Sequence, residues 1–166
     1  KTTSVQELGG YRTQFKKSQD QDLWLRLSTK GKIACINRPL ALIRKHDDQI
    51  SNDNAGQQQI LYSHMAMTSY FLKKLNHPDP LESKKDLKAF KEFIALKLKE
   101  KEFFEYQRFI NQIKLKVPAA KSSFGNFYSL IKYTIFHFRF LCRYIKFRFF
   151  GSNLPIEFAH LWTKSF

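Results

Sequence analysis

The sequence predicts a mainly helical chain with a short α/β portion at its start. Helical spacing of apolar residues dominates from residue 57 onward. Two short apolar runs before it, residues 32–36 and 40–43, indicate strands, and the second is apolar at every position, as in a strand buried on both faces. Hydrophobic residues make up 43% and charged residues 26% of the 166 residues, which is ordinary globular usage and argues against wholesale disorder.

The first element expected is a short helix at residues 22–27. Leu23, Trp24 and Leu27 have the spacing of one apolar helix face, so we expect all three to pack. Lys30 and Gly31 follow it as a stop signal. The expected strands come next, and no neighbouring strand for them is evident in this sequence.

The second half is predicted to be helix after helix. A helix at residues 57–75 is followed by a start signal in which Asp79 is the N-cap, Pro80 the first helical residue and Glu82 the third. Helical periodicity then continues to residue 117 with a break near residues 99–101.

A last long helical stretch is expected at residues 122–150. The chain divides into three segments by composition: 1–52, 53–118 and 119–166.

Charge and cysteine content narrow the class of protein. There are 29 Lys and Arg against 14 Asp and Glu, a net charge of +15, and aromatic residues reach 16%. The two cysteines, Cys35 and Cys142, cannot form a disulfide framework, which fits a reducing compartment. No apolar run is long enough to cross a membrane. The chain begins with Lys1, so we expect it to be part of a longer protein.

Two aspartates mark the start of the first helix. Asp20 and Asp22 lie where exposed N–H groups favour negative charge, next to a flexible Gly9-Gly10 joint. An ionised carboxylate in such a place can act as a general base. The same pattern also suits two helix-capping aspartates with no chemical role, and the spacing alone favours that interpretation.

The order of residues around these aspartates resembles family 2 glycosyltransferases, specifically the second half of their GT-A catalytic domain. The resemblance covers about residues 8–51. It is carried by Gly9-Gly10-Tyr11, Phe15, Gln19-Asp20-Gln21-Asp22-Leu23-Trp24-Leu25-Arg26-Leu27, Gly31, Pro39-Leu40-Ala41, Arg44-Lys45-His46 and Ser51.

The resemblance implies a role for several residues. Asp20 matches the general base of inverting members, and Asp22 matches a second acidic position of more structural character. Gly9 and Gly10 match the turn that lets the acceptor and sugar approach the backbone. Gln19 stands where the family usually has Glu, so contacts with the acceptor are expected to differ.

Two further matches lie near the donor. Arg44 is expected to offset phosphate charge, and His46 matches a histidine near the diphosphate or its metal in some members. Without the family match, His46 followed by two aspartates is better explained as a solvated polar turn; with the match, the two interpretations are about even.

The function that the resemblance implies is sugar transfer, with inversion, from a nucleotide-sugar donor to a saccharide or lipid-linked acceptor in envelope polysaccharide or lipopolysaccharide synthesis. The Mn²⁺ or Mg²⁺ ion of such enzymes is held mostly by an upstream Asp-x-Asp motif, and none precedes Gly9. We therefore expect this chain to be the C-terminal part of the enzyme and inactive alone.

The segment from residue 106 to 156 has nine Lys and Arg and no acidic residue. On a helix, Lys132, Arg139, Arg143 and Lys146 form a basic stripe beside aromatic residues, which is typical of an interfacial membrane helix. The aromatic face could instead pack as ordinary core. The absence of any DNA- or RNA-binding motif in the sequence argues against nucleic-acid binding.

Together with the membrane interpretation, the resemblance implies a peripheral position on the inner face of the bacterial cytoplasmic membrane. The rival to an enzyme is a non-catalytic, basic helical module that binds membrane or nucleic acid.

Overall fold

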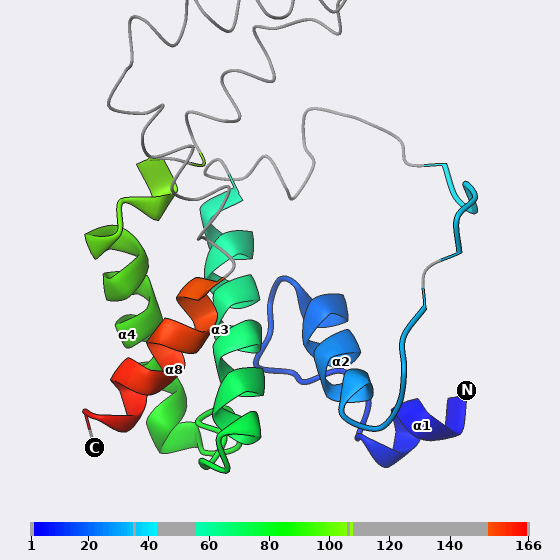
Figure 1. The fold of residues 1–166 in the computed structure, drawn as a ribbon, viewed down its shortest axis with the longest axis horizontal. Helices are drawn as coiled ribbons and strands as arrows, with labels where there is room; N and C mark the ends of the chain where they lie inside the picture. Colours follow the sequence, from blue (N-terminus) through cyan, green and yellow to red (C-terminus); the bar gives the residue numbers. More distant parts are fainter. Residues whose placement is uncertain (1, 35, 43–55, 106, 108–152, 166) are drawn as a thin grey trace, which may run out of the picture. The chain divides into compact units, whose positions relative to one another are not determined.

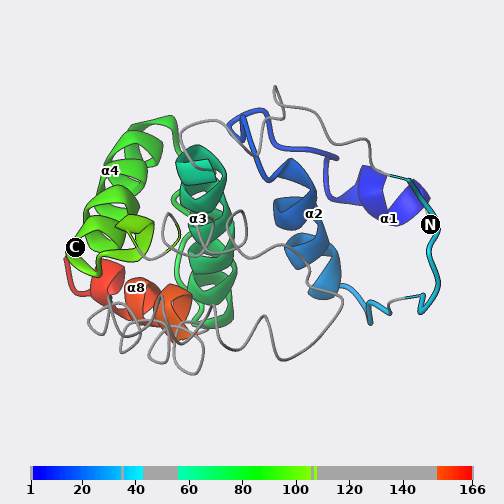
Figure 2. The same cartoon turned by 90° about the horizontal axis from the view of Figure 1, so that it is seen from above.

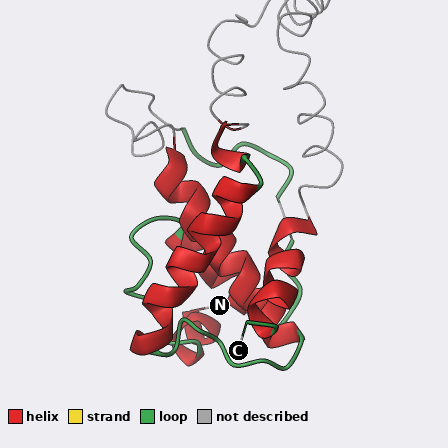
Figure 3. Ribbon diagram, turned by 90° about the vertical axis from the view of Figure 1, so that its left-hand side faces the viewer, coloured by secondary structure: helices red, strands yellow, loops and turns green. Residues whose placement is uncertain are grey.

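The computed structural model describes the chain except residues 1, 35, 43–55, 106, 108–152 and 166. Its helices are α1 (Thr2–Glu7), α2 (Gln19–Ser28), α3 (Gln57–Lys74), α4 (Lys84–Glu100) and α8 (Leu154–Thr163) (Figure 1). The prediction of a mostly helical chain is confirmed for this part, in which Figure 3 shows helices and loops and no strand.

The chain divides into two compact units, residues 1–95 with 155–166, and residues 96–154. Within the first unit, α2 packs on α3 and α1 packs on α2, as Figures 1 and 2 show. Segments from the start, the middle and the end of the sequence therefore share one unit.

The core of the first unit is built from large apolar side chains that are almost completely buried. Phe15 packs against Tyr62 of α3 with tilted rings whose centroids are 5.9 Å apart, and this contact joins the loop before α2 to α3. On α8, Phe158 is fully buried and its ring lies 6.3 Å from that of His64 on α3. Burial of such rings is the main stabilising contribution of this packing.

The predicted helices at residues 22–27 and 57–75 correspond to α2 and α3. The break predicted near residues 99–101 is also present, because α4 ends at Glu100 and Glu102 has φ 54. Two helices were not predicted: α1 and α8. The helix predicted at residues 122–150 lies outside the described residues.

The strands predicted at residues 32–36 and 40–43 are wrong for the described residues, which form coil there. Ile33, Ile36, Leu40 and Leu42 are exposed, Leu42 completely. A strand satisfies its backbone groups by pairing with another strand, and no described residue supplies a partner. The α/β portion of the GT-A type is accordingly not seen in the described part of residues 1–52.

The helix start predicted at Asp79 is also wrong. Pro80 and Glu82 belong to a turn, in which the Asp79 carboxylate accepts a hydrogen bond from the Leu81 N–H at 3.0 Å. The helix begins four residues later, where Ser83 precedes Lys84 and its Oγ accepts from the Asp86 N–H at 3.4 Å. Asp79 is used for a buried ion pair instead, which the local pattern could not reveal.

Candidate functional site

Asp20 lies exposed in the first turn of α2 and lines a surface hollow of about 320 Å³. Ser18, directly before the helix, has φ 55 and donates its hydroxyl proton to the Gln59 carbonyl at 3.0 Å, which fixes the start of α2 against the start of α3. The hollow is lined by Tyr11, Lys16, Lys17, Ser18, Gln19, Asp20 and Gln59. A carboxylate here can reach a ligand without any rearrangement of the core.

Gln19 is held by its own loop. Its Nε2 donates a hydrogen bond to the Phe15 carbonyl at 2.5 Å. A glutamate, which the resemblance would place here, has no proton to donate when ionised. The glutamine thus stabilises the loop that precedes α2, and only its remaining polar atoms can face the hollow.

Asp22 has a different environment, although it lies only two residues after Asp20. Its side chain is buried, and its Oδ2 accepts a hydrogen bond from Arg26 Nε at 2.9 Å and forms an ion pair with Arg26 Nη2, also at 2.9 Å. Arg12 Nε lies 3.6 Å from the same oxygen. Asp22, predicted as a substrate-side residue of structural character, is therefore committed to ion pairs inside the unit.

The Gly9-Gly10 turn closes α1. Gly9 (φ +73) and Gly10 (φ +69) both have the left-handed backbone that favours glycine. The Gly10 N–H donates to the Val5 carbonyl and the Gly9 N–H to the Gln6 carbonyl, each at 2.9 Å, which is the Schellman pattern of a helix C-terminus. Both glycines therefore serve this helix end, and the role near a substrate that the resemblance implies for them stays a prediction.

Arg26 joins that turn to α2. Besides its pair with Asp22, it donates through Nη1 to the Leu8 carbonyl at 2.8 Å and through Nη2 to the Gly10 carbonyl at 2.6 Å. The glycine turn therefore has a fixed position relative to the helix that carries Asp20.

Arg12 and Asp79 extend the ion pairs to the turn after α3. Arg12 Nη2 lies 2.8 Å from Asp79 Oδ2, an ion-pair distance at an angle outside that of a hydrogen bond. Asp79 Oδ1 accepts from the Ser69 hydroxyl at 2.8 Å. Sequence reasoning missed both Arg12 and Asp79, since partners so far apart in sequence leave no local pattern.

Trp24 was expected to pack with Leu23 and Leu27, but the indole is 56% exposed while Leu23 is buried. On the surface of α2, residues four apart are neighbours, so Trp24 lies one turn after Asp20 on the same side. The exposed face of α2 therefore presents a carboxylate followed by an aromatic ring.

The other predicted site residues lie outside the described residues: Arg44, His46, Lys132, Arg139, Arg143 and Lys146. In the described part of the chain, no three His, Cys, Asp or Glu side chains come together as metal ligands. None of the helices found in that part has the length and apolar character needed to cross a bilayer.

Comparison of the chain with protein-family models, curated proteins and solved structures finds no match.

Proposed function

We propose that the chain is the acceptor-side part of a glycosyltransferase and that Asp20 is its general base. The observation that carries the proposal is the contrast between two aspartates in one helix turn. Asp22 is buried between two arginines, whereas Asp20 is exposed and lines a hollow. The order of motif residues from Gly9 to Ser51 supplies the class of reaction.

In the proposed step, Asp20 takes the proton from a hydroxyl of the saccharide or lipid-linked acceptor. The hydroxyl oxygen attacks the anomeric carbon of the nucleotide sugar, and the bond to the nucleotide diphosphate breaks with inversion. In the first turn of α2, the Asp20 carboxylate accepts a hydrogen bond from the Gln21 N–H at 2.8 Å. Lys16 and Lys17 line the same hollow and would attract an anionic reactant.

The resemblance also implies a Mn²⁺ or Mg²⁺ ion, toward which His46 would contribute. The described residues contain no set of side chains that fits such an ion.

The test is replacement of Asp20 by Asn in the full-length protein, with transfer from nucleotide-sugar donors as the readout. General-base catalysis contributes about 10²- to 10⁴-fold, so we expect Asp20→Asn to lose that much of kcat and to stay folded. Glu92→Gln, which neutralises an exposed carboxylate on α4, is the matched control and should retain full activity. Unchanged transfer by Asp20→Asn would remove Asp20 as the base.

The second candidate is a non-catalytic basic module, favoured by the net charge of +15 and by the basic stripe. For the transferase we propose a peripheral location on the inner face of the bacterial cytoplasmic membrane, which the resemblance implies. Reversing the charge of Lys132, Arg139, Arg143 and Lys146 should abolish flotation with anionic liposomes. Unchanged flotation would contradict the membrane proposal.

A further inference from the structure

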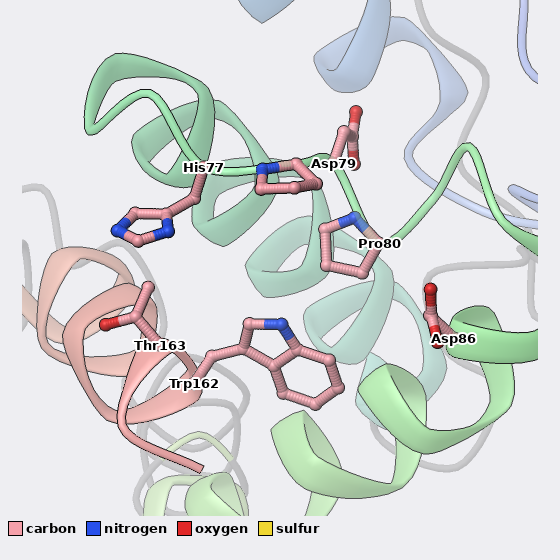
Figure 4. A pocket seen from close by; sticks show the side chains of 7 residues that line it. His77, Asp79, Pro80, Asp86, Trp162 and Thr163 are labelled. Carbon is pink, nitrogen blue, oxygen red and sulfur yellow. The ribbon is translucent and has the colours of Figure 1, made fainter. Parts of the chain in front are cut away.

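We propose that a second hollow of the first unit binds a neutral saccharide ring. It has a volume of about 440 Å³, within the range of small-molecule sites. Figure 4 shows it from close by. Its walls are the turn after α3, the start of α4 and the end of α8, and its lining residues are His77, Pro78, Asp79, Pro80, Asp86, Trp162 and Thr163.

Trp162 provides one aromatic ring at a fixed position. Its indole is packed edge-to-face by Phe90 and Phe93 of α4, with ring centroids 5.0 and 5.1 Å away. Neither phenylalanine lines the hollow, so both contact the indole outside it. The hollow therefore contains a single supported aromatic platform.

The opposite wall is also preorganised. The turn that holds His77 is a Schellman helix end, in which the His77 N–H donates to the Leu72 carbonyl at 2.9 Å and Asn76 has φ 58. The prolines 78 and 80 restrict the backbone beyond it. The Ser69–Asp79 hydrogen bond anchors this segment to α3.

Three polar side chains surround the indole. Figure 4 shows His77 and Thr163 on one side of Trp162 and Asp86 on the other, while the Asp79 carboxylate points away from the indole. The direction of Asp79 agrees with its pairing to Arg12. The groups left for a ligand are thus an imidazole, one carboxylate and, as an acceptor, the Thr163 hydroxyl oxygen, whose own proton is donated to the His160 carbonyl at 2.9 Å.

The charge of the lining disfavours anionic ligands. No Lys or Arg lines this hollow, although the whole chain has a net charge of +15. A phosphate or nucleotide would meet Asp86 without a cationic partner. A purely apolar ligand would desolvate His77, Asp86 and Thr163 without compensating them.

An organic cation fits less well than a sugar. Cation sites of the aromatic-cage kind surround the ligand with several aromatic faces, and here a single indole is offered. The net positive charge of the chain also repels cations at long range. A sugar ring has an apolar C–H face for the indole and hydroxyls at its edge for His77, Asp86 and Thr163, so it matches each feature of the lining.

The test is isothermal titration of the intact protein with glucose, galactose, N-acetylglucosamine and lactose, without nucleotide donor. We expect saturable binding of at least one sugar and a loss of about tenfold or more in affinity for Asp86→Asn, an exposed substitution that leaves the core untouched. Trp162→Ala should abolish binding, and Trp162→Phe should retain part of it. Tyr70→Ala, which removes an aromatic ring of α3 that lines neither hollow, is the matched control and should bind as the parent does.

Saturation-transfer NMR with irradiation of aromatic protons adds a readout specific to stacking, because protons on one face of the sugar should receive the strongest transfer. Absence of saturable binding by every sugar would overturn the proposal. So would full affinity in both Asp86→Asn and Trp162→Phe together with even transfer to the two sugar faces. Saturable binding of tetramethylammonium or inorganic phosphate in place of sugars would assign the hollow to another class of ligand.

The saccharide site does not depend on the transfer reaction. Asp20→Asn should bind the sugar as the parent does, since Asp20 lines the other hollow. The transfer assay and the binding assay therefore test the two proposals separately, and either proposal can fail while the other stands.

Discussion

Replacing Asp22 by Asn tests whether the buried ion pairs hold α2 in place. Arg12, Arg26, Asp22 and Asp79 form a chain of pairs with balanced charge. Asparagine keeps the size of the side chain but leaves two guanidinium groups with one carboxylate. The Arg12 and Arg26 side chains are only 15% and 11% exposed, so water can replace little of what is lost.

Removing one partner of a buried ion pair lowers the free energy of unfolding by about 3–5 kcal/mol. Because the two arginines are partly exposed, we expect Asp22→Asn to lower it by about 3 kcal/mol, near the smaller value. The assay is urea denaturation at neutral pH, compared with Asp20→Asn in the same buffer. The exposed carboxylate of Asp20 should contribute less than about 1 kcal/mol through the helix dipole. Equal decreases in the free energy of unfolding for the two variants, or a decrease below about 1 kcal/mol for Asp22→Asn, would show that the ion pairs do not hold α2 in place.

Two further predictions concern α3. Burial lowers the pKa of His64 from 6.5, and the Ile60 carbonyl 3.0 Å from Nδ1 partly opposes this shift. Between pH 6.5 and the lower pKa of the folded state, only the unfolded chain takes up the proton. The free energy of unfolding should therefore be fully retained above pH 6.5 and decline as the pH falls below it. The His64→Gln variant should show a flatter profile of unfolding free energy against pH, and an unchanged profile would contradict this. Thr68 is fully buried and its Oγ1 has no hydrogen-bond partner among the described residues, so Thr68→Val should raise stability by about 1 kcal/mol in thermal denaturation; a clear loss of stability would point to a partner for the hydroxyl.

The helices that could be predicted from sequence are those whose pattern is local. In α2 the apolar spacing and the acidic first turn are visible in ten residues, and α3 shows helical periodicity over eighteen. The exposure of Trp24 was not visible in the same way, because i+1 spacing places it beside Leu23 but does not determine where the packed face ends.

Features that depend on distant partners escaped prediction. Asp79 has the sequence context of a helix cap, yet Arg12 and Ser69 determine its position. An apolar run such as residues 40–43 indicates a strand only if another strand is available to pair with it. In the candidate site, Asp20 was found from its motif, whereas the hollow around it also requires Gln59 from another helix.

The position of α8 has a consequence for how the first unit is made. Residues 155–166 complete a unit whose other members all precede residue 96, and Phe158 is buried against His64 far upstream. Contacts between such distant parts of a chain slow folding, and synthesis proceeds from the N-terminus. While a ribosome is still adding the intervening residues, Phe90 and its neighbours on α4 lack the Trp162 contact. We expect the first unit of a nascent chain to remain incompletely packed and accessible to chaperones until α8 has emerged from the ribosome.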